Sequence, residues 1–183
     1  MSERRLFFAL WPDERARDEL MRNAAAVTAD IRHSQPGVRC YSPGDIHLTL
    51  AFIGPASATY QACLTSAARQ VSENEKIQPF LLEISRLGYF ERAGILWAGC
   101  QLCPAPLAHL QATLVMALAA CGYQAESRAF KPHVTLARKV GKPQSLPSFR
   151  PVLWQVNGFC LAESLPVTEG PRYRVIEEFQ FAV

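Results

Sequence analysis

Two short segments of this chain carry the same arrangement of side chains suited to acid–base chemistry. Both run His-apolar-Thr-Leu-Ala, with His47 and Thr49 in the first and His133 and Thr135 in the second, nearly half a chain apart. In a β-strand, side chains at positions i and i+2 point to the same face, about 7 Å apart. If each segment is a strand, it presents an imidazole beside a hydroxyl on one face.

The same alternation assigns the apolar neighbours to the opposite face. It places Leu48, Leu50 and Phe52 behind the first pair, and Val134 and Leu136 behind the second. One His-x-Thr pattern is a weak signal, because both residue types occur in ordinary strands. Two matching copies are a stronger signal, and a repeat retained only for structure is the competing interpretation.

Paired imidazoles and hydroxyls suit chemistry at phosphorus. Two histidines can divide acid and base work near neutral pH, one neutral and one protonated. Threonine hydroxyls can donate hydrogen bonds to the nonbridging oxygens of a phosphate. If an approximate two-fold axis relates the halves of the chain, the two pairs face each other across a cleft. The pattern therefore favours an in-line displacement in which one histidine activates the nucleophile and the other protonates the leaving oxygen, with no metal ion or cofactor.

Apolar periodicity and turn signals predict the elements that would position these residues. The expected helices cover residues 12–30, 57–71 and 104–121. The expected strands cover residues 6–11, 38–41, 46–53, 80–90, 95–100, 131–139, 152–162 and 173–181, and residues 141–151, with three prolines, form a loop. Because short turns join several strands, the sheets should be largely antiparallel. We therefore predict an α+β fold rather than a doubly wound parallel sheet.

Composition indicates a globular chain with one domain over residues 1–183. Hydrophobic residues make up 49% of the 183 residues, and the mean hydropathy is near zero. The net charge of +3 is too small to imply a coating of duplex nucleic acid, but it permits a local basic pocket for a phosphate. No apolar run approaches the roughly 20 residues that span a membrane, and the first residues lack the long apolar region of a signal peptide. We expect a monomeric, cytoplasmic protein without membrane contact.

The six cysteines offer one alternative site. Only Cys100 and Cys103 form a C-x-x-C pair, and neither a second pair nor a histidine at metal-binding spacing accompanies them. We expect all six to be reduced and mostly buried thiols, as in a cytosolic protein. A zinc-dependent role for this pair is the weaker hypothesis.

The paired motifs HLTL and HVTL resemble those of the two-histidine (2H) phosphoesterase superfamily. More closely, the segments RRLFFAL, IHLTLAFIG and RAFKPHVTLAR resemble the bacterial RNA 2′,3′-cyclic phosphodiesterases, also called LigT-like or 2′-5′ RNA ligase-like proteins. The resemblance covers almost the whole chain in element order. It implies a bilobal α+β fold with two pseudo-symmetric halves, both motifs lining a central cleft and helices on the outside.

The resemblance also implies an activity and a role for each motif residue. The expected reaction converts RNA 2′,3′-cyclic phosphate ends, tRNA fragments included, to terminal 2′-phosphates without a metal ion, and 2′-5′ ligation of RNA ends is a related activity. By motif position, His47 is the general acid on the departing 3′ oxygen and His133 is the base that activates water. Thr49 and Thr135 hold the phosphate. A non-catalytic nucleotide-binding module that retains this cleft is the alternative.

Arg138 matches the arginine that follows the second threonine of this family by three residues. A guanidinium there would neutralise charge developing on the phosphoryl oxygens. Strict alternation, however, places Arg138 on the face opposite His133, so it reaches the cleft only if the strand ends or bulges near Ala137. Arg128 is either a second phosphate ligand or a solvated side chain. Four aromatic residues could stack on a base, although each residue type is more often part of a core: Phe7, Phe8, Phe52 and Tyr173.

Overall fold

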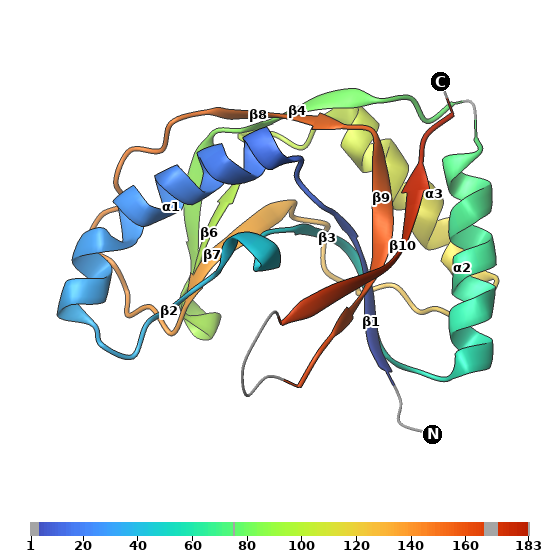
Figure 1. The fold of residues 1–183 in the computed structure, drawn as a ribbon, viewed down its shortest axis with the longest axis horizontal. Helices are drawn as coiled ribbons and strands as arrows, with labels where there is room; N and C mark the ends of the chain where they lie inside the picture. Colours follow the sequence, from blue (N-terminus) through green and yellow to red (C-terminus); the bar gives the residue numbers. More distant parts are fainter. Residues whose placement is uncertain (1–3, 75, 167–171, 183) are drawn as a thin grey trace.

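One eight-stranded sheet organises the chain in the computed structural model, which describes residues 4–74, 76–166 and 172–182 (Figure 1). Its strand order is β10-β9-β1-β3-β7-β6-β5, with β2 paired to β7, and every pairing among the described residues is antiparallel. These strands are β1 (Arg4–Leu10), β2 (Arg39–Cys40), β3 (Leu48–Ala56), β5 (Arg86–Phe90), β6 (Ile95–Gly99), β7 (His133–Arg138), β9 (Gly158–Ser164) and β10 (Tyr173–Gln180). A separate two-stranded sheet pairs β4 (Phe80–Ile84) with β8 (Val152–Val156).

The large sheet divides into two lobes where β3 meets β7. On one side β1, β9 and β10 extend from β3, and on the other β6 and β5 extend from β7. A single residue pair, Leu48 with Val134, joins β3 to β7, whereas the neighbouring ladders within each lobe are longer. The α+β, bilobal and antiparallel architecture expected from the sequence is confirmed.

Three helices cover the outside of the strands (Figure 1). α1 (Glu14–Ser34) packs against β8, while α2 (Ala58–Ser72) packs against α3 (Ala105–Ala119) and β10. The side chain of Asp13 accepts a hydrogen bond from the N–H of Ala16 at 2.8 Å, and Ser57 accepts one from Tyr60 at 3.2 Å, so a polar cap begins each of the first two helices. None of these described helices combines the length and apolar composition that a membrane crossing requires.

Two expected strands are each divided in the structure. Residues 80–90 form β4 and β5, and residues 152–162 contribute β8 and most of β9, so the first part of each pairs in the small sheet and the second part joins the large one. At the first division, Ser85 donates its N–H to the carbonyl of Gly99. At the second, a Cβ on Gly158 would lie 2.2 Å from the carbonyl oxygen of Phe179, so the chain bends tightly against β10. Strand-like sequence lies on both sides of each bend, so the expected strands run through Ser85 and Asn157.

The expectation that every cysteine is reduced is wrong for one pair. Cys63 in α2 and Cys121 just after α3 form a disulfide, while Cys40, Cys100, Cys103 and Cys160 are free. The two partners are 58 residues apart, and only the packing of α2 against α3 brings them together.

Candidate active site

The two His-x-Thr motifs meet at the junction of the lobes. His47 immediately precedes β3 and His133 begins β7, and their next residues, Leu48 and Val134, form the pair that joins the strands. The four motif side chains are half-buried, whereas Leu48 and Val134 are fully buried behind them. The predicted alternation is therefore correct through both threonines, and the structure brings both motifs to one place.

Both imidazoles are held by the same kind of hydrogen bond. His47 Nδ1 lies 2.7 Å from the carbonyl oxygen of Asp45, and His133 Nδ1 lies 2.8 Å from that of Lys131. A carbonyl oxygen only accepts, so each Nδ1 carries the proton and each Nε2 has a free lone pair in the neutral ring. Both bonds go to the residue two positions earlier. Each Nε2 can therefore accept a proton and, once protonated, donate it.

Three aromatic rings surround His47. Trp11 stacks on it with centroids 5.2 Å apart and a 14° interplanar angle, while Phe7 and Tyr173 lie 5.0 Å and 4.7 Å away. Burial removes water that would stabilise the imidazolium and lowers the pKa of His47 to about 4. Without substrate, this ring is neutral at pH 7.

His133 has a similar apolar setting with a cation beside it. The Phe90 and Trp97 rings form T-shaped contacts with His133, at centroid distances of 5.1 and 6.1 Å. The Lys131 ammonium lies over those two rings, at 4.9 and 4.7 Å from their centroids. Burial lowers the pKa of His133 as well, with the charges of Lys131 and Arg138 acting in the same direction.

A β-bulge turns Arg138 toward the site. Leu96 and Trp97 are consecutive in β6, but their partners in β7 are Ala137 and Thr135, so Leu136 is an extra residue in the ladder. Leu136 and Ala137 are both buried, and alternation resumes with Arg138 exposed on the side of Thr135. The bulge that the sequence analysis required for Arg138 is thus present.

The first motif has a matching bulge. Consecutive Phe8 and Ala9 in β1 pair with Ala51 and Thr49, which leaves Leu50 as the extra residue. Phe52 therefore turns to the side of Thr49 and is 43% exposed, so the expectation that it packs behind the strand is wrong. Phe52 and Arg138 occupy equivalent positions, three residues after the threonines of their motifs.

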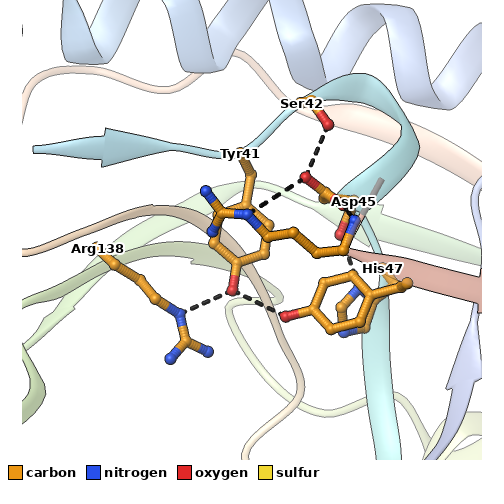
Figure 2. A network of polar contacts seen from close by, with 7 residues as sticks. Tyr41, Ser42, Asp45, His47 and Arg138 are labelled. Atoms are coloured by element: carbon orange, nitrogen blue, oxygen red, sulfur yellow. Dashed lines mark hydrogen bonds and ion pairs between the residues drawn. The ribbon is translucent and has the colours of Figure 1, made fainter. Parts of the chain in front are cut away.

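Two tyrosines link Arg138 to the environment of His47 (Figure 2). Arg138 Nε donates to Tyr41 Oη at 2.7 Å, and Tyr41 Oη lies 3.2 Å from Tyr173 Oη. The Tyr173 ring in turn contacts His47. Among the described residues, no carboxylate lies within ion-pair distance of Arg138, so its charge is uncompensated at the site.

A buried carboxylate anchors the loop that holds His47 (Figure 2). Asp45 accepts a hydrogen bond from Ser42 Oγ at 2.7 Å and another from the Arg172 N–H at 3.0 Å, and Arg172 Nε lies 3.9 Å away. The carbonyl of this same Asp45 accepts from His47. Sequence reasoning missed both Asp45 and Tyr41, because no local pattern connects them to the motifs.

A cleft of about 1030 Å³ opens beside Thr49 and His133. Phe52 and Arg128 line it, and Arg128 also pairs with Glu126 at 3.2 Å. Of the other aromatic candidates for base stacking, Phe8 is fully buried in the core, whereas Phe7 and Tyr173 contact His47.

The alternative zinc site has little support in the geometry. Burial raises the pKa of Cys100 to about 11 and also raises that of Cys103, which opposes the thiolate form that binds metal. Within residues 4–74, 76–166 and 172–182, no three histidine, cysteine or acidic side chains are grouped so that they could hold a metal ion.

A bilobal α+β fold with one His-x-Thr pair from each lobe at a common centre defines a two-histidine phosphoesterase. The chain belongs to the 2′-5′ RNA ligase superfamily, whose family model matches residues 14–169. This confirms the resemblance drawn from the motifs.

Named relatives are similar over most of their length. An RNA 2′,3′-cyclic phosphodiesterase of Escherichia coli is 31% identical over 150 residues, which cover 80% of this chain and 79% of that protein. An RNA 2′,3′-cyclic phosphodiesterase of Thermus thermophilus is 28% identical over 183 residues, which cover 96% of this chain and 89% of that protein. The crystal structure of E. coli LigT complexed with 3′-AMP has a TM-score of 0.84 to this chain, with 24% identity and 99% of both chains covered. That likeness establishes the fold.

Proposed function

We propose that this protein hydrolyses RNA 2′,3′-cyclic phosphate ends to 2′-phosphates with His47 and His133 as its two proton-transfer groups. The observation that carries the proposal is the matched pair of imidazoles, each held through Nδ1 by a backbone carbonyl and each with an unblocked Nε2. The relatives in E. coli and T. thermophilus that bear the name of this activity support it.

The proton transfers follow from the motif positions. His133 Nε2 accepts a proton from water as the water oxygen attacks phosphorus. The bond from phosphorus to O3′ breaks, and the departing oxygen takes a proton from His47 Nε2. The products are a 2′-phosphate and a free 3′-hydroxyl, and proton exchange with solvent restores both rings.

The acid role of His47 requires the substrate to change its protonation. The free ring has a pKa of about 4 because it is buried. A bound phosphate brings negative charge against the ring, which favours the imidazolium and raises its pKa. Substrate binding thus charges the acid that the reaction needs.

The remaining site residues would hold the phosphate. Thr49 and Thr135 donate their hydroxyl protons to the nonbridging oxygens, and the Arg138 guanidinium neutralises charge that develops there. The hydrogen bond to Tyr41 fixes the orientation of Arg138. Since side chains supply both proton transfers and charge neutralisation, we propose that no metal ion or cofactor takes part.

The same bond changes support ligation. If the 5′-hydroxyl of a second RNA replaces water, its oxygen attacks phosphorus, the bond to O3′ breaks, and a 2′-5′ linkage results. The groups that activate water and protonate O3′ are unchanged. We include this as a secondary activity.

The oligomeric state, the domain organisation and the cellular location of the enzyme belong to the same proposal. We propose a monomeric enzyme of one domain that acts in the cytoplasm, where RNA fragments with cyclic ends, including those of tRNA, would be its substrates. Light scattering should give the mass of one 20.3 kDa chain. A dimer in solution would refute the monomer.

The decisive experiment uses a short RNA that ends in a 2′,3′-cyclic phosphate, incubated with the protein in EDTA. We expect a 2′-phosphate product, and a loss of about 10²- to 10⁴-fold in kcat in His47→Ala and in His133→Ala, the usual contribution of one acid or base. His109→Ala is the matched control, because His109 lies on the exposed face of α3.

Each other outcome has a defined meaning. A 3′-phosphate product would keep the activity class and reverse the acid and base roles. Tight nucleotide binding without turnover by folded protein would identify the non-catalytic module instead. Activity that EDTA abolishes would overturn the metal-independent mechanism.

A further inference from the structure

The indole ring of Trp11 lies almost parallel to the imidazole of His47. The two ring centroids are 5.2 Å apart, and the ring planes differ by 14°. The other two rings around His47 meet it at steeper angles, 39° for Phe7 and 77° for Tyr173. Of these three contacts, that of Trp11 is therefore the face-to-face one.

The alternation of side chains along β1 determines where the Trp11 ring lies. Phe7, Ala9 and Trp11 occupy every second position, and Trp11 comes directly after the last residue of the strand. On the neighbouring β9, Cys160 and Ala162 belong to the same apolar cluster. Because three of these five side chains are small, this face of the sheet has room for the indole. The sheet thus positions Trp11 before any substrate binds.

A stacked indole stabilises the charged form of an imidazole. The face of an aromatic ring carries partial negative charge, so it attracts a cation within about 6 Å of the ring centroid, and Trp does so most strongly. The contact between Trp11 and His47 lies within that distance. Burial of His47 acts in the opposite direction and lowers its pKa to about 4. The indole face therefore offsets part of the cost of burying the imidazolium.

The other groups that face His47 act on its charge in both directions. Asp45, at the end of η1 (Pro43–Asp45), favours the imidazolium through its carbonyl and its carboxylate. His133 and Arg138 of β7 disfavour it by repulsion. Tyr173 of β10 contacts the ring, but burial raises the pKa of this phenol, so it carries no charge at pH 7. The indole face is thus a separate contribution in favour of the charged ring.

The described surroundings of His133 provide no stacked ring. Phe90 and Trp97 meet it at interplanar angles of 87° and 66°. The ammonium of Lys131 lies over those two rings, and its charge opposes a second positive charge on the imidazole. At this histidine the aromatic faces attract a neighbouring cation instead of the imidazole. Aromatic stacking therefore supports an imidazolium at His47 and not at His133.

We propose that Trp11 is a positioning residue for the general acid, with an indole face that fixes the plane of the His47 ring and stabilises its imidazolium. The inference rests on the proposed function, because only the acid role of His47 requires a charged ring when the reaction begins. In the substrate complex, the negative phosphate and the indole face act on the same ring in the same direction. Trp11 therefore helps the bound substrate to charge the acid.

The test compares Trp11→Leu, which removes the aromatic face but keeps an apolar side chain, with Trp11→Phe, which retains a face. The alkaline limb of the kcat profile reports the loss of the acid in the enzyme–substrate complex. In Trp11→Leu this limb should move to lower pH by about 0.4 to 1.5, and kcat on the limb should fall about 2- to 30-fold. Trp11→Phe should restore most of this loss. KM should change little, because Trp11 does not line the cleft.

Phe149→Leu is the matched control. Phe149 is a half-buried aromatic residue that neither lines the cleft nor makes a ring contact with either histidine, so its kcat profile should equal that of the native protein. If Trp11→Leu fails to fold, Trp11→Met repeats the comparison with a longer apolar side chain.

Three results would overturn the proposal. The first is an alkaline limb that does not move in Trp11→Leu. The second is a limb that moves to higher pH, which would mean that Trp11 acts on His47 only by excluding water. The third is a Trp11→Phe variant as impaired as Trp11→Leu, which would show that the size of the side chain matters and its face does not.

An NMR titration separates this inference from the proposed function. If the protein turns over no cyclic phosphate, the proposed function fails, but the pKa of His47 is still measurable in saturating inorganic phosphate. Its resonance is assigned by its absence in His47→Ala. A pKa lower by about 0.4 to 1.5 in Trp11→Leu than in the native protein and in Trp11→Phe would support the effect of the indole on the ring. Equal pKa values in all three proteins would overturn it.

Discussion

At the scale of single residues, the two histidines share a hydrogen-bond pattern but differ in their surroundings. Both Nδ1 protons go to the carbonyl two residues earlier, which sets the same tautomer. Three aromatic rings enclose His47 and two contact His133, where Lys131 adds positive charge, while the charge of Arg138 acts on both histidines. Both effects favour neutral imidazoles before substrate binds.

The lowered pKa values predict an acidic optimum for kcat/KM, which reports the free enzyme. One imidazole must be protonated and the other neutral. The rate falls at low pH, where both imidazoles are protonated, and again as the pH rises past both lowered pKa values, because the proton that His47 must donate is then lost. We expect the maximum below about pH 6.5, the ordinary pKa of an imidazole. The kcat profile should lie at higher pH, because the bound phosphate raises the pKa of the acid.

Steady-state rates measured from pH 4 to 9 would check this prediction. The same assays on His109→Ala control for effects of histidine removal away from the site. A maximum of kcat/KM above pH 7 would contradict the lowered pKa values of the two histidines.

Arg138 and its hydrogen-bond partner provide a second prediction at this scale. Arg138→Met should lower kcat by about 10²- to 10³-fold, as the loss of one group that stabilises developing negative charge commonly does. Tyr41→Phe keeps the guanidinium but removes its acceptor, so we expect a smaller loss of about tenfold, mainly in kcat. Arg22→Met is the matched control, since Arg22 is exposed on α1 and lies outside both motifs and the cleft. If Tyr41→Phe raises KM and leaves kcat unchanged, Tyr41 acts in substrate binding instead.

At the scale of elements, bulges and helix contacts decide what reaches the site. The extra residue Leu136 shifts the alternation of side chains at the end of β7 by one residue. Arg138 therefore lies on the same face as His133 and Thr135. The disulfide between Cys63 and Cys121 holds α3, which lines part of the cleft beside Thr49 and His133, against α2. The register of β6 and β7 thus determines which face carries Arg138, and the packing of α2 against α3 positions one wall of the cleft.

The disulfide should contribute measurably to stability. Closing a loop of this size restricts the unfolded chain, and the chain-entropy relation gives about 4 kcal/mol, of which natural disulfides commonly realise about 2–4 kcal/mol. Reduction should lower the free energy of unfolding in urea by that amount. The Cys63→Ser, Cys121→Ser double variant should show the same loss and no further response to reductant. Thiol titration of the denatured, unreduced protein should find four thiols, and six would contradict the disulfide.

At the scale of the whole molecule, two similar lobes form one asymmetric site. Each lobe supplies a histidine, a threonine and a bulge at the following leucine. The lobes differ three residues after the threonine, where one has Phe52 and the other Arg138. Arg138 donates a hydrogen bond to Tyr41, whereas Phe52 lines the cleft beside Thr49 and His133. The similarity provides two imidazoles, and the difference makes the site asymmetric.

The sequence by itself determined the helices, most strands, the α+β class and the alignment of each histidine with its threonine, because these depend on local periodicity. Only the tertiary structure decided the bulges at Leu50 and Leu136, the bends at Ser85 and Asn157, and the disulfide. Each of these depends on a partner strand or helix distant in sequence. The same holds for Tyr41 and Asp45, whose contacts with Arg138 and Arg172 form only when the lobes and their connecting loops come together. Local patterns carry no information about such partners, since the contacts arise from packing between segments rather than from spacing within one.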